Sequence, residues 1–438
     1  MASETPLPSA SGDEGSGLVR LSLVAALGGI GVGIVGGAFR QALLHAGDGR
    51  RSFLSWAGDQ RWVGWVLVVA VVAAGAALAR ALVRLVPVAS GSGVQHVEAV
   101  WRGEVEPTTW LLLPVKFAGA VVGIGSGLVL GREGPTIHMG AVIGSEAGRA
   151  FSLDADDRRL LQTALGGAGL AVAFNAPLAG AVFVFEEVAR SVRMRLALPT
   201  LIGSATAIAC SRGIVADQPD FLVAPVARPS GWMVVTFVVF GLVTGVLGIA
   251  YNRLIVAGVD LFARFPQWSP EARAAVVGGV VGLVLWFDPL LAGGGDVLAQ
   301  RVLDGGITTL ALAGYLTVRF LIGPWSYSAG TPGGLFAPLL AVGAVWGALA
   351  ARVVDPVWPA AVASPAALAM VGMAAFFAAV VRAPLTGMVL IVEMTAVTSL
   401  LVPMLAACFA AVLVATLVGA EPIYDSLRAR LPRVGEGA

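Results

Sequence analysis

The stretch Gly131-Arg132-Glu133-Gly134-Pro135 places a carboxylate between two glycines in the middle of an apolar sequence. The glycines permit backbone that is neither helix nor strand, and Pro135 suits the first position of a helix. The free N–H groups at such a helix start carry partial positive charge and attract anions. We therefore predict that Glu133 lies beside an anion slot formed by neighbouring amides, where its carboxylate competes with a mobile anion.

A simpler interpretation is that Glu133 only caps a helix end, as carboxylates often do. A charged group inside an apolar segment is costly, however, and usually marks a functional site. The interpretation as a gate is therefore the one that we carry forward.

The composition is that of a protein with many membrane-spanning segments. Of the 438 residues, 57% are hydrophobic and only 13% are charged, with a mean hydropathy of +0.86. Soluble domains carry about 25% charged residues. Uncharged runs near or above the ~18 residues that cross a bilayer as a helix occupy 21–39, 62–79, 229–252 and 394–420. The apolar pieces 177–185 and 383–392 are shorter and contain Gly or Pro, which is typical of re-entrant helices.

Net charge and cysteine usage exclude two further classes of protein. The formal net charge is +1 and there is no long basic run, so we expect no nucleic-acid partner. Cys210 and Cys408 both lie in apolar segments. We expect them to be small core residues and not a disulfide framework.

No set of residues has the pattern of a catalytic or metal site. Ser126 and His138 lie close in sequence, but Ile124-Gly125-Ser126-Gly127 is not the Gly-x-Ser-Gly box of a serine hydrolase. The only histidines, His45, His96 and His138, are not spaced with cysteines or carboxylates as metal ligands are. We therefore predict no enzymatic activity, no catalytic residue, no metal and no cofactor.

The charges that flank the apolar segments indicate an orientation. The first 18 residues are rich in Ser, Gly and Pro, without a basic segment before the apolar stretch. We expect residues 1–18 to be a disordered tail and not a cleaved signal peptide. By the positive-inside rule, we expect the arginine clusters beside apolar segments to be cytoplasmic. These clusters are Arg80 and Arg84; Arg190, Arg193 and Arg195; and Arg428, Arg430 and Arg433.

The chain contains an internal repeat. Lys116-Phe117, Gly127, Gly131, Pro135 and Gly140 recur 203 residues later as Arg319-Phe320, Gly330, Gly334, Pro338 and Gly343. The segment 176–180 and Glu186 recur 207 residues later as 383–387 and Glu393. Broken helices at matching positions of two halves indicate a transporter whose substrate site lies at the repeat interface. We predict halves at 19–225 and 226–438, the second ending in a short cytoplasmic helix; the sequence alone does not distinguish parallel from inverted repeats.

Four motifs together resemble the CLC family of chloride channels and proton-coupled chloride exchangers, over about residues 20–430. They are Gly91-Ser92-Gly93-Val94-Gln95, Gly131-Arg132-Glu133-Gly134-Pro135, Gly333-Gly334-Leu335-Phe336-Ala337-Pro338 and Tyr424. The resemblance implies an all-α polytopic membrane fold with two inverted repeats and broken helices. It also implies a homodimer in the lipid bilayer of the cell (inner) membrane, with one anion pathway per subunit and both termini cytoplasmic.

The resemblance also implies the residues of the chloride site. Ser92 and Tyr424 would supply hydroxyls to a dehydrated chloride, and the amides of Leu335 and Phe336 would complete that site. The backbone of Gly131, Arg132 and Gly134 would form an outer anion site. From the residues alone, Ser92 could instead be a helix N-cap and Tyr424 an interfacial anchor.

Two glutamates decide whether the protein resembles an exchanger or a channel. Glu133 matches the family's gating glutamate, which blocks an anion position when it is deprotonated and swings away when it is protonated. Glu187 matches the internal proton-transfer glutamate of the family's exchangers, although it could also be a helix-end acid that faces water. We therefore expect an antiporter of chloride and protons. The alternative is a passive voltage- or pH-gated chloride channel of the same family.

Some residues depart from the family's pattern or are unusual in an apolar context. Gln95 stands where the family usually has proline, which leaves the anion selectivity open. Glu98 and Lys116 are charged within apolar segments, where such groups are usually tolerated as a buried pair. Such a pair could stabilise the fold or tune the proton path, and we expect the structural role. Only 14 residues follow Tyr424, so we expect no CBS domains and a bacterial type of CLC protein.

Overall fold

The computed structural model describes residues 11–60, 62–215, 217–356 and 364–431. Within these ranges the regular structure is helical, apart from two isolated β-bridges. The first eight α-helices are α1 (Ser11–Gly58), α2 (Gly64–Leu82), α3 (Val94–Trp101), α4 (Leu112–Ser126), α5 (Glu133–Ala150), α6 (Ala155–Phe174), α7 (Pro177–Phe183) and α8 (Met194–Ser211). The others are α9 (Val234–Ala263), α10 (Pro270–Phe287), α11 (Asp296–Leu303), α12 (Thr309–Tyr327), α13 (Phe336–Val354), α14 (Pro365–Val381), α15 (Pro384–Thr395), α16 (Leu401–Leu417) and α17 (Ile423–Arg428).

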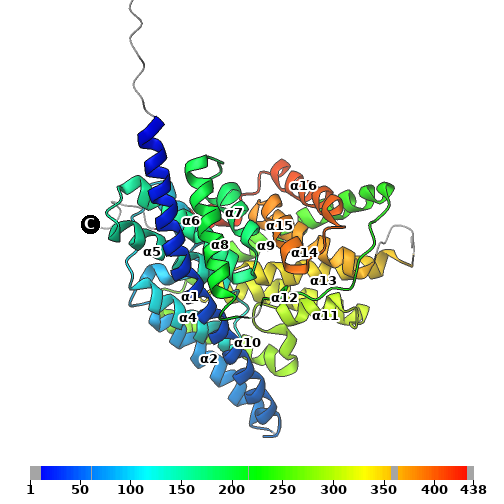
Figure 1. Cartoon of the computed structure of the whole chain (residues 1–438). Coiled ribbons are helices and arrows are strands. Elements are labelled where there is room, and N and C mark those ends of the chain that lie inside the picture. The colour runs from blue at the N-terminus through cyan, green and yellow to red at the C-terminus, as the bar shows by residue number, and fades with distance from the viewer. Residues whose placement is uncertain (1–10, 61, 216, 357–363, 432–438) are drawn as a thin grey trace, which may run out of the picture.

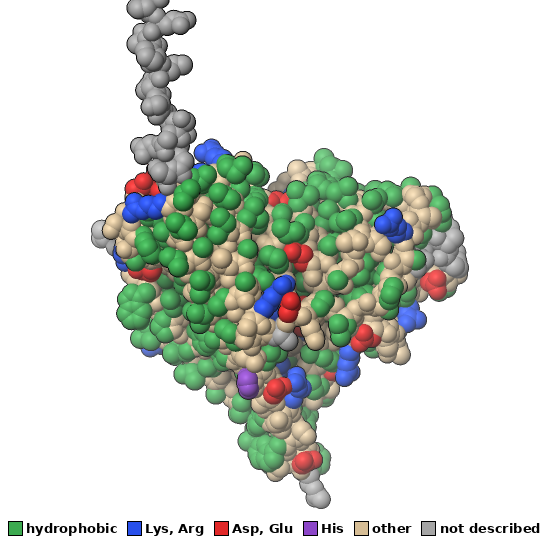
Figure 2. Space-filling model, viewed as in Figure 1, with side chains coloured by type: hydrophobic (Ala, Val, Ile, Leu, Met, Phe, Trp, Pro, Cys, Tyr) green, Lys and Arg blue, Asp and Glu red, His purple; other side chains and the backbone are tan. Residues whose placement is uncertain are grey.

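Several helices are long and apolar enough to cross a membrane. Among the described residues there are six, and they belong to α1, α2, α8, α9, α10 and α13. Hydrophobic side chains cover most of the face in Figure 2, where charged groups are few and scattered. The uncharged runs at 21–39, 62–79 and 229–252 largely coincide with these helices, as predicted. The run at 394–420 contains the 17-residue helix α16. Helix α1 begins at Ser11, so residues 11–18 of the predicted tail are helical, and residues 1–10 lie outside the described ranges.

The two short broken segments form the helices α7 and α15, which pack against each other. Each helix starts with a proline and is capped by a glutamate from the other half of the chain. The Glu393 carboxylate accepts hydrogen bonds from the N–H groups of Leu178 (3.1 Å) and Ala179 (2.7 Å). The Glu186 carboxylate accepts from those of Leu385 (3.0 Å) and Thr386 (2.7 Å). This reciprocal capping satisfies free N–H groups at both helix starts, and it explains why the two glutamates recur at the same spacing.

The same helix pairs occur in the two halves of the chain. Helix α5 packs on α6 as α13 packs on α14, and α1 packs on α8 as α9 packs on α16. In Figure 1, α5 and α6 lie on the left, α13 to α16 lie on the right, and α7 and α8 lie between them. This pairing agrees with the internal repeat, while the division of the chain near residue 225 stays a prediction.

Lys116 and Arg319 are fully buried at matching positions of the repeat. Lys116 Nζ donates hydrogen bonds to the carbonyls of Ala89 (3.0 Å) and Gly91 (2.7 Å). Arg319 donates to carbonyls at 290–293 in the matching loop before α11. The predicted pair of Lys116 with Glu98 is therefore wrong. The ammonium group instead holds the glycine loop before α3, whose backbone carbonyls accept its hydrogen bonds.

Candidate functional site

Two glycine-rich loops from opposite halves of the chain meet at the centre of the site. Gly131 N–H donates to Gly334 O and Gly334 N–H donates to Gly131 O, both at 2.8 Å. A third loop joins them, because Gly91 bridges to Pro332 and accepts a hydrogen bond from Gly333 N–H at 3.1 Å. These contacts bring together the starts of α3, α5 and α13. Three helix N-termini with their partial positive charge therefore point into one region.

Glu133 lies within this region as the first residue of α5 and is 0% exposed. Its Oε1 accepts a hydrogen bond of 2.6 Å from the N–H of Phe336, the first residue of α13. Its Oε2 has no hydrogen-bond partner among the described residues. The carboxylate thus accepts a hydrogen bond from the amide at the start of another helix. A mobile anion can also bind at such a helix start.

Glycine at 134 and 334 is required by the close approach of the two helix starts. A Cβ atom built on Gly134 would lie 2.5 Å from Ser92 Oγ and 2.9 Å from Gly334 Cα. A Cβ atom on Gly334 would lie 2.7 Å from Gly134 N and the same distance from the carboxyl carbon of Glu133. Ser92 Oγ, the Glu133 carboxylate and the start of α13 therefore all lie next to these two glycines.

Ser92 and Tyr424 bring two hydroxyl groups to the same region. Both residues are 0% exposed, and neither hydroxyl has a hydrogen-bond partner among the described residues. The Tyr424 ring packs on the Phe336 ring with a centroid distance of 5.9 Å. Leu335, whose amide was predicted beside that of Phe336, is buried as the N-cap of α13. Buried polar atoms normally have partners. Two unpaired hydroxyls beside helix starts therefore indicate a site for a ligand that accepts hydrogen bonds.

Arg132 in this loop belongs to a cluster of arginines and aspartates. Arg132 donates from Nε to Ala173 O (2.7 Å) and from Nη2 to Asp220 (2.6 Å), and Asp220 also pairs with Arg40. A cavity of about 150 Å³ is lined by Arg40, Arg50, Arg51, Gly131 and Arg132. The N–H group of Gly131 already donates to Gly334 O. The predicted outer anion site, formed by the backbone of Gly131, Arg132 and Gly134, stays a prediction.

Glu187 lies in a π-helical turn, Val184–Val188, that follows α7. It is 1% exposed, so the interpretation as a helix-end acid that faces water is wrong. Its nearest cation is Arg190, at 4.0 Å, and it interacts electrostatically with the fully buried Glu98. Glu98 itself pairs with Arg428, which follows Tyr424 by one turn, at 3.1 Å. Glu187 is thus held in a buried charged cluster beside the helix that carries Tyr424.

One buried pair of histidines beside the site was not predicted from the sequence. His96 of α3 and His138 of α5 approach each other with Nδ1 and Nε2 3.2 Å apart, and the His96 Nε2 lies 3.4 Å from Thr108 Oγ1. No spacing rule links two histidines that lie 42 residues apart. No group of three or more potential metal ligands occurs among the described residues.

Comparisons with known proteins agree with this geometry. A family described as voltage gated chloride channel matches residues 74–416. The chain is 34% identical over 420 residues to the H(+)/Cl(-) exchange transporter ClcA of Vibrio parahaemolyticus, covering 94% of this chain and 90% of that one. It is 36% identical over 407 residues to ClcA of Vibrio cholerae, covering 91% and 87%. Among solved structures, it is similar to a slow cyanobacterial Cl-/H+ antiporter, with a TM-score of 0.89, 30% identity and coverage of 94% and 97%.

Proposed function

This chain belongs to the voltage-gated chloride channel family, and on that premise we propose that it is a secondary active antiporter. It exchanges chloride, or a similar monovalent anion, for protons across a membrane. The relatives named above are H(+)/Cl(-) exchange transporters and a Cl-/H+ antiporter, which supports this proposal over a passive channel. The single observation that carries it is the hydrogen bond of the buried Glu133 carboxylate to the Phe336 amide.

Chloride binds in this proposal to neutral donors only. The hydroxyls of Ser92 and Tyr424 and the amides of Leu335 and Phe336 replace the water that the ion loses. A full positive charge would hold chloride too tightly for rapid passage, whereas hydroxyl and amide dipoles offset dehydration and still let the ion leave. The free hydroxyls and the packing of Tyr424 on Phe336 support this donor set.

The Glu133 carboxylate and the anion compete for the same place. When it is ionised, the carboxylate binds the Phe336 amide and closes the path. Protonation weakens that bond, because a neutral carboxyl accepts a weaker hydrogen bond than a carboxylate does. The side chain then moves away with its proton and an anion takes its position. Proton and anion are thereby exchanged through one group.

Glu187 provides the proton on the inner side. Its carboxyl is buried beside Arg190 at one end of the cluster, and Tyr424 interacts electrostatically with both Glu133 and Glu187. Two titratable carboxyls, on α5 and on the turn after α7, are therefore available to the proton near Tyr424. A passive channel needs no such acid, and the burial of Glu187 favours the antiporter.

The protein is an integral membrane protein of several spans. We extend the proposal to a homodimer in the cell (inner) membrane, with both termini in the cytoplasm. No cofactor, metal or enzymatic step enters this mechanism. Chloride and protons are the substrates.

The test uses the purified protein in liposomes that hold an outward chloride gradient. A chloride electrode and a pH electrode record the two fluxes together. If the protein is an antiporter, chloride efflux should drive protons into the liposomes when the internal and external pH are equal at the start. Chloride efflux without proton movement would instead identify a passive channel.

A further inference from the structure

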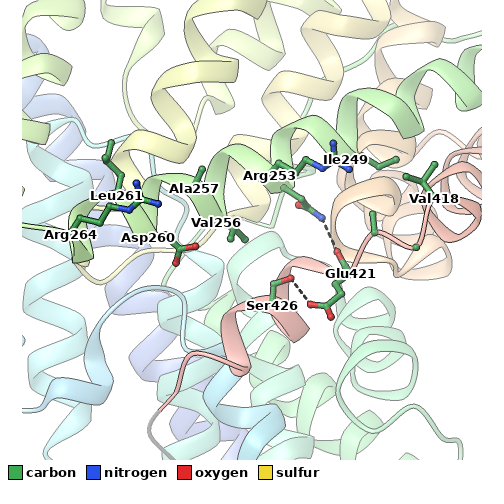
Figure 3. A pocket seen from close by; sticks show the side chains of 13 residues that line it. Ile249, Arg253, Val256, Ala257, Asp260, Leu261, Arg264, Val418, Glu421 and Ser426 are labelled. Atoms are coloured by element: carbon green, nitrogen blue, oxygen red, sulfur yellow. Dashed lines mark hydrogen bonds between the residues drawn. The ribbon is translucent and has the colours of Figure 1, made fainter.

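A cavity of about 690 Å³ opens between the second half of α9 and the segment that joins α16 to α17. Figure 3 shows Asp260 and Arg264 at one end of it and Val418 and Glu421 at the other. It lies outside the anion site, but its wall includes Ser426, two residues after Tyr424.

Two arginines and two carboxylates, Asp260 and Glu421, line this cavity, but the arginines have no direct partner among the described residues. Arg253 and Arg264 both line it and lie 11 residues apart on α9, which places them on one face about 16 Å apart at a rise of about 1.5 Å per residue. Neither makes a hydrogen bond from its side chain or an ion pair within 4 Å among the described residues. Arg264 attracts Asp260 electrostatically, but both carboxylate oxygens of Asp260 already accept hydrogen bonds of 3.0 Å from Arg430.

The position of Arg253 makes its lack of a direct partner informative. Arg253 is exposed and lies ten residues before the end of a helix that is apolar enough to span a membrane. An arginine without a partner at this depth is costly unless it meets an anion. The neighbouring Asn252 is 7% exposed, and its Oδ1 accepts no hydrogen bond from the described residues. The cavity therefore offers positive charge for an anion together with a buried acceptor for a hydroxyl group.

A second, apolar groove of about 470 Å³ continues from this cavity between α9, α10 and α12. Ala257 and Leu261 line both spaces. Leu254, Val284 and Leu321 are among the side chains that line the groove. A charged pocket that continues into an apolar groove on a membrane-facing helix is complementary to an amphiphile. A soluble anion would fill only the first part.

We propose that the cavity and the groove together bind one anionic phospholipid. Its phosphate lies between Arg253 and Arg264, a headgroup hydroxyl donates to Asn252 Oδ1, and an acyl chain occupies the groove beyond Ala257. Asn252 Nδ2 also donates to Glu421 O at 3.4 Å, and Ser426 Oγ donates to Glu421 Oε2 at 3.2 Å. The lipid would therefore contact the segment that holds Tyr424 in place.

The test is native mass spectrometry of the full-length protein after lipid removal in detergent, titrated with palmitoyl-oleoyl phosphatidylglycerol. We expect one saturable adduct per chain. Because each arginine contributes a charge-assisted hydrogen bond, Arg253→Gln and Arg264→Gln should each weaken binding by about tenfold or more. Arg193→Gln is the matched control, since Arg193 is also an exposed arginine without a partner among the described residues. Equal adducts on all four proteins, or adducts that never saturate, would overturn the proposal.

Two further arms separate the lipid from other ligands. Ala257→Trp fills the junction between cavity and groove and should reduce phosphatidylglycerol binding; unchanged binding would show that no chain lies there. Inorganic phosphate should not compete, and competition at equal concentration would identify a soluble anion instead. A phosphatidylglycerol with a photoreactive acyl chain tests the wild-type protein directly. Labelling should concentrate on α9, α10 and α12, and labelling spread evenly over the apolar surface would contradict the site.

Discussion

Replacing Gly334 by alanine is expected to displace the Glu133 carboxylate from its position on the Phe336 amide. The added Cβ atom would lie 2.7 Å from both Gly134 N and the carboxyl carbon of Glu133. Real Cβ atoms essentially never approach other heavy atoms below 3.0 Å. The Glu133 side chain can move away from the added atom, whereas the contact with Gly134 N also forces the two helix starts apart. Both shifts weaken the hydrogen bond of the carboxylate to the Phe336 amide.

The size of the effect follows from the hydrogen bond that is lost. A hydrogen bond to a charged group contributes about 1.5–3 kcal/mol, which corresponds to a factor of about 10–150 in an equilibrium. The bound carboxylate should become less populated by that factor. In the wild type, chloride flux should fall as pH rises, because the ionised carboxylate binds the amide. In Gly334→Ala this fall should be largely absent.

Chloride efflux from liposomes, measured at a series of pH values, tests this prediction. Gly306→Ala is the control, since Gly306 is exposed with no atom within 4 Å of an added Cβ. The double variant with Glu133→Ala separates two causes: if the methyl group acts only through the carboxylate, Gly334→Ala adds nothing in that background. A pH dependence identical to that of the wild type would refute the reasoning. An equal loss of flux with and without the carboxylate would show that the methyl group blocks the anion itself.

Three other predictions concern the donors, the proton and the fold. Ser92→Ala should change the order of chloride and nitrate transport, and an unchanged order in flux assays would remove Ser92 from the selectivity site. Glu187→Gln should reduce proton transport more than anion transport in the same liposomes, whereas equal losses would indicate a folding defect. Glu186→Ala should lower stability by about 0.5–2 kcal/mol because a helix start loses its cap; thermal unfolding in detergent should show a decrease of similar size for Glu393→Ala, and no decrease in either would contradict the reciprocal capping.

Much of the architecture could be predicted from the sequence. The glycine motifs predicted the starts of α5 and α13, and the repeat predicted that they belong together, as the bridge between Gly131 and Gly334 now shows. The short segments that contain proline are the helices α7 and α15. The all-helical CLC-like fold is confirmed by the helices and by the solved relative. These features can be predicted from the sequence because they depend on local properties: the positions of glycine and proline and the length of apolar segments.

The partners of buried charges could not be predicted in the same way. Lys116 donates to two backbone carbonyls. Every residue has a backbone carbonyl, so the sequence does not indicate which ones accept. Glu98 pairs with Arg428, which lies 330 residues away. The burial of Glu187 depends on a π-helical turn that shifts the register after α7. The hydrogen bond from Gly131 N–H to Gly334 O is likewise a tertiary contact, which no local sequence pattern predicts.

The most direct measurement of the central claim records chloride and proton fluxes of Glu133→Gln beside those of the wild type. Glutamine has nearly the shape of glutamate, but it cannot ionise or carry the exchanged proton. The account predicts that chloride movement persists while the coupled proton movement disappears. Proton movement that remains coupled to chloride in Glu133→Gln would contradict it.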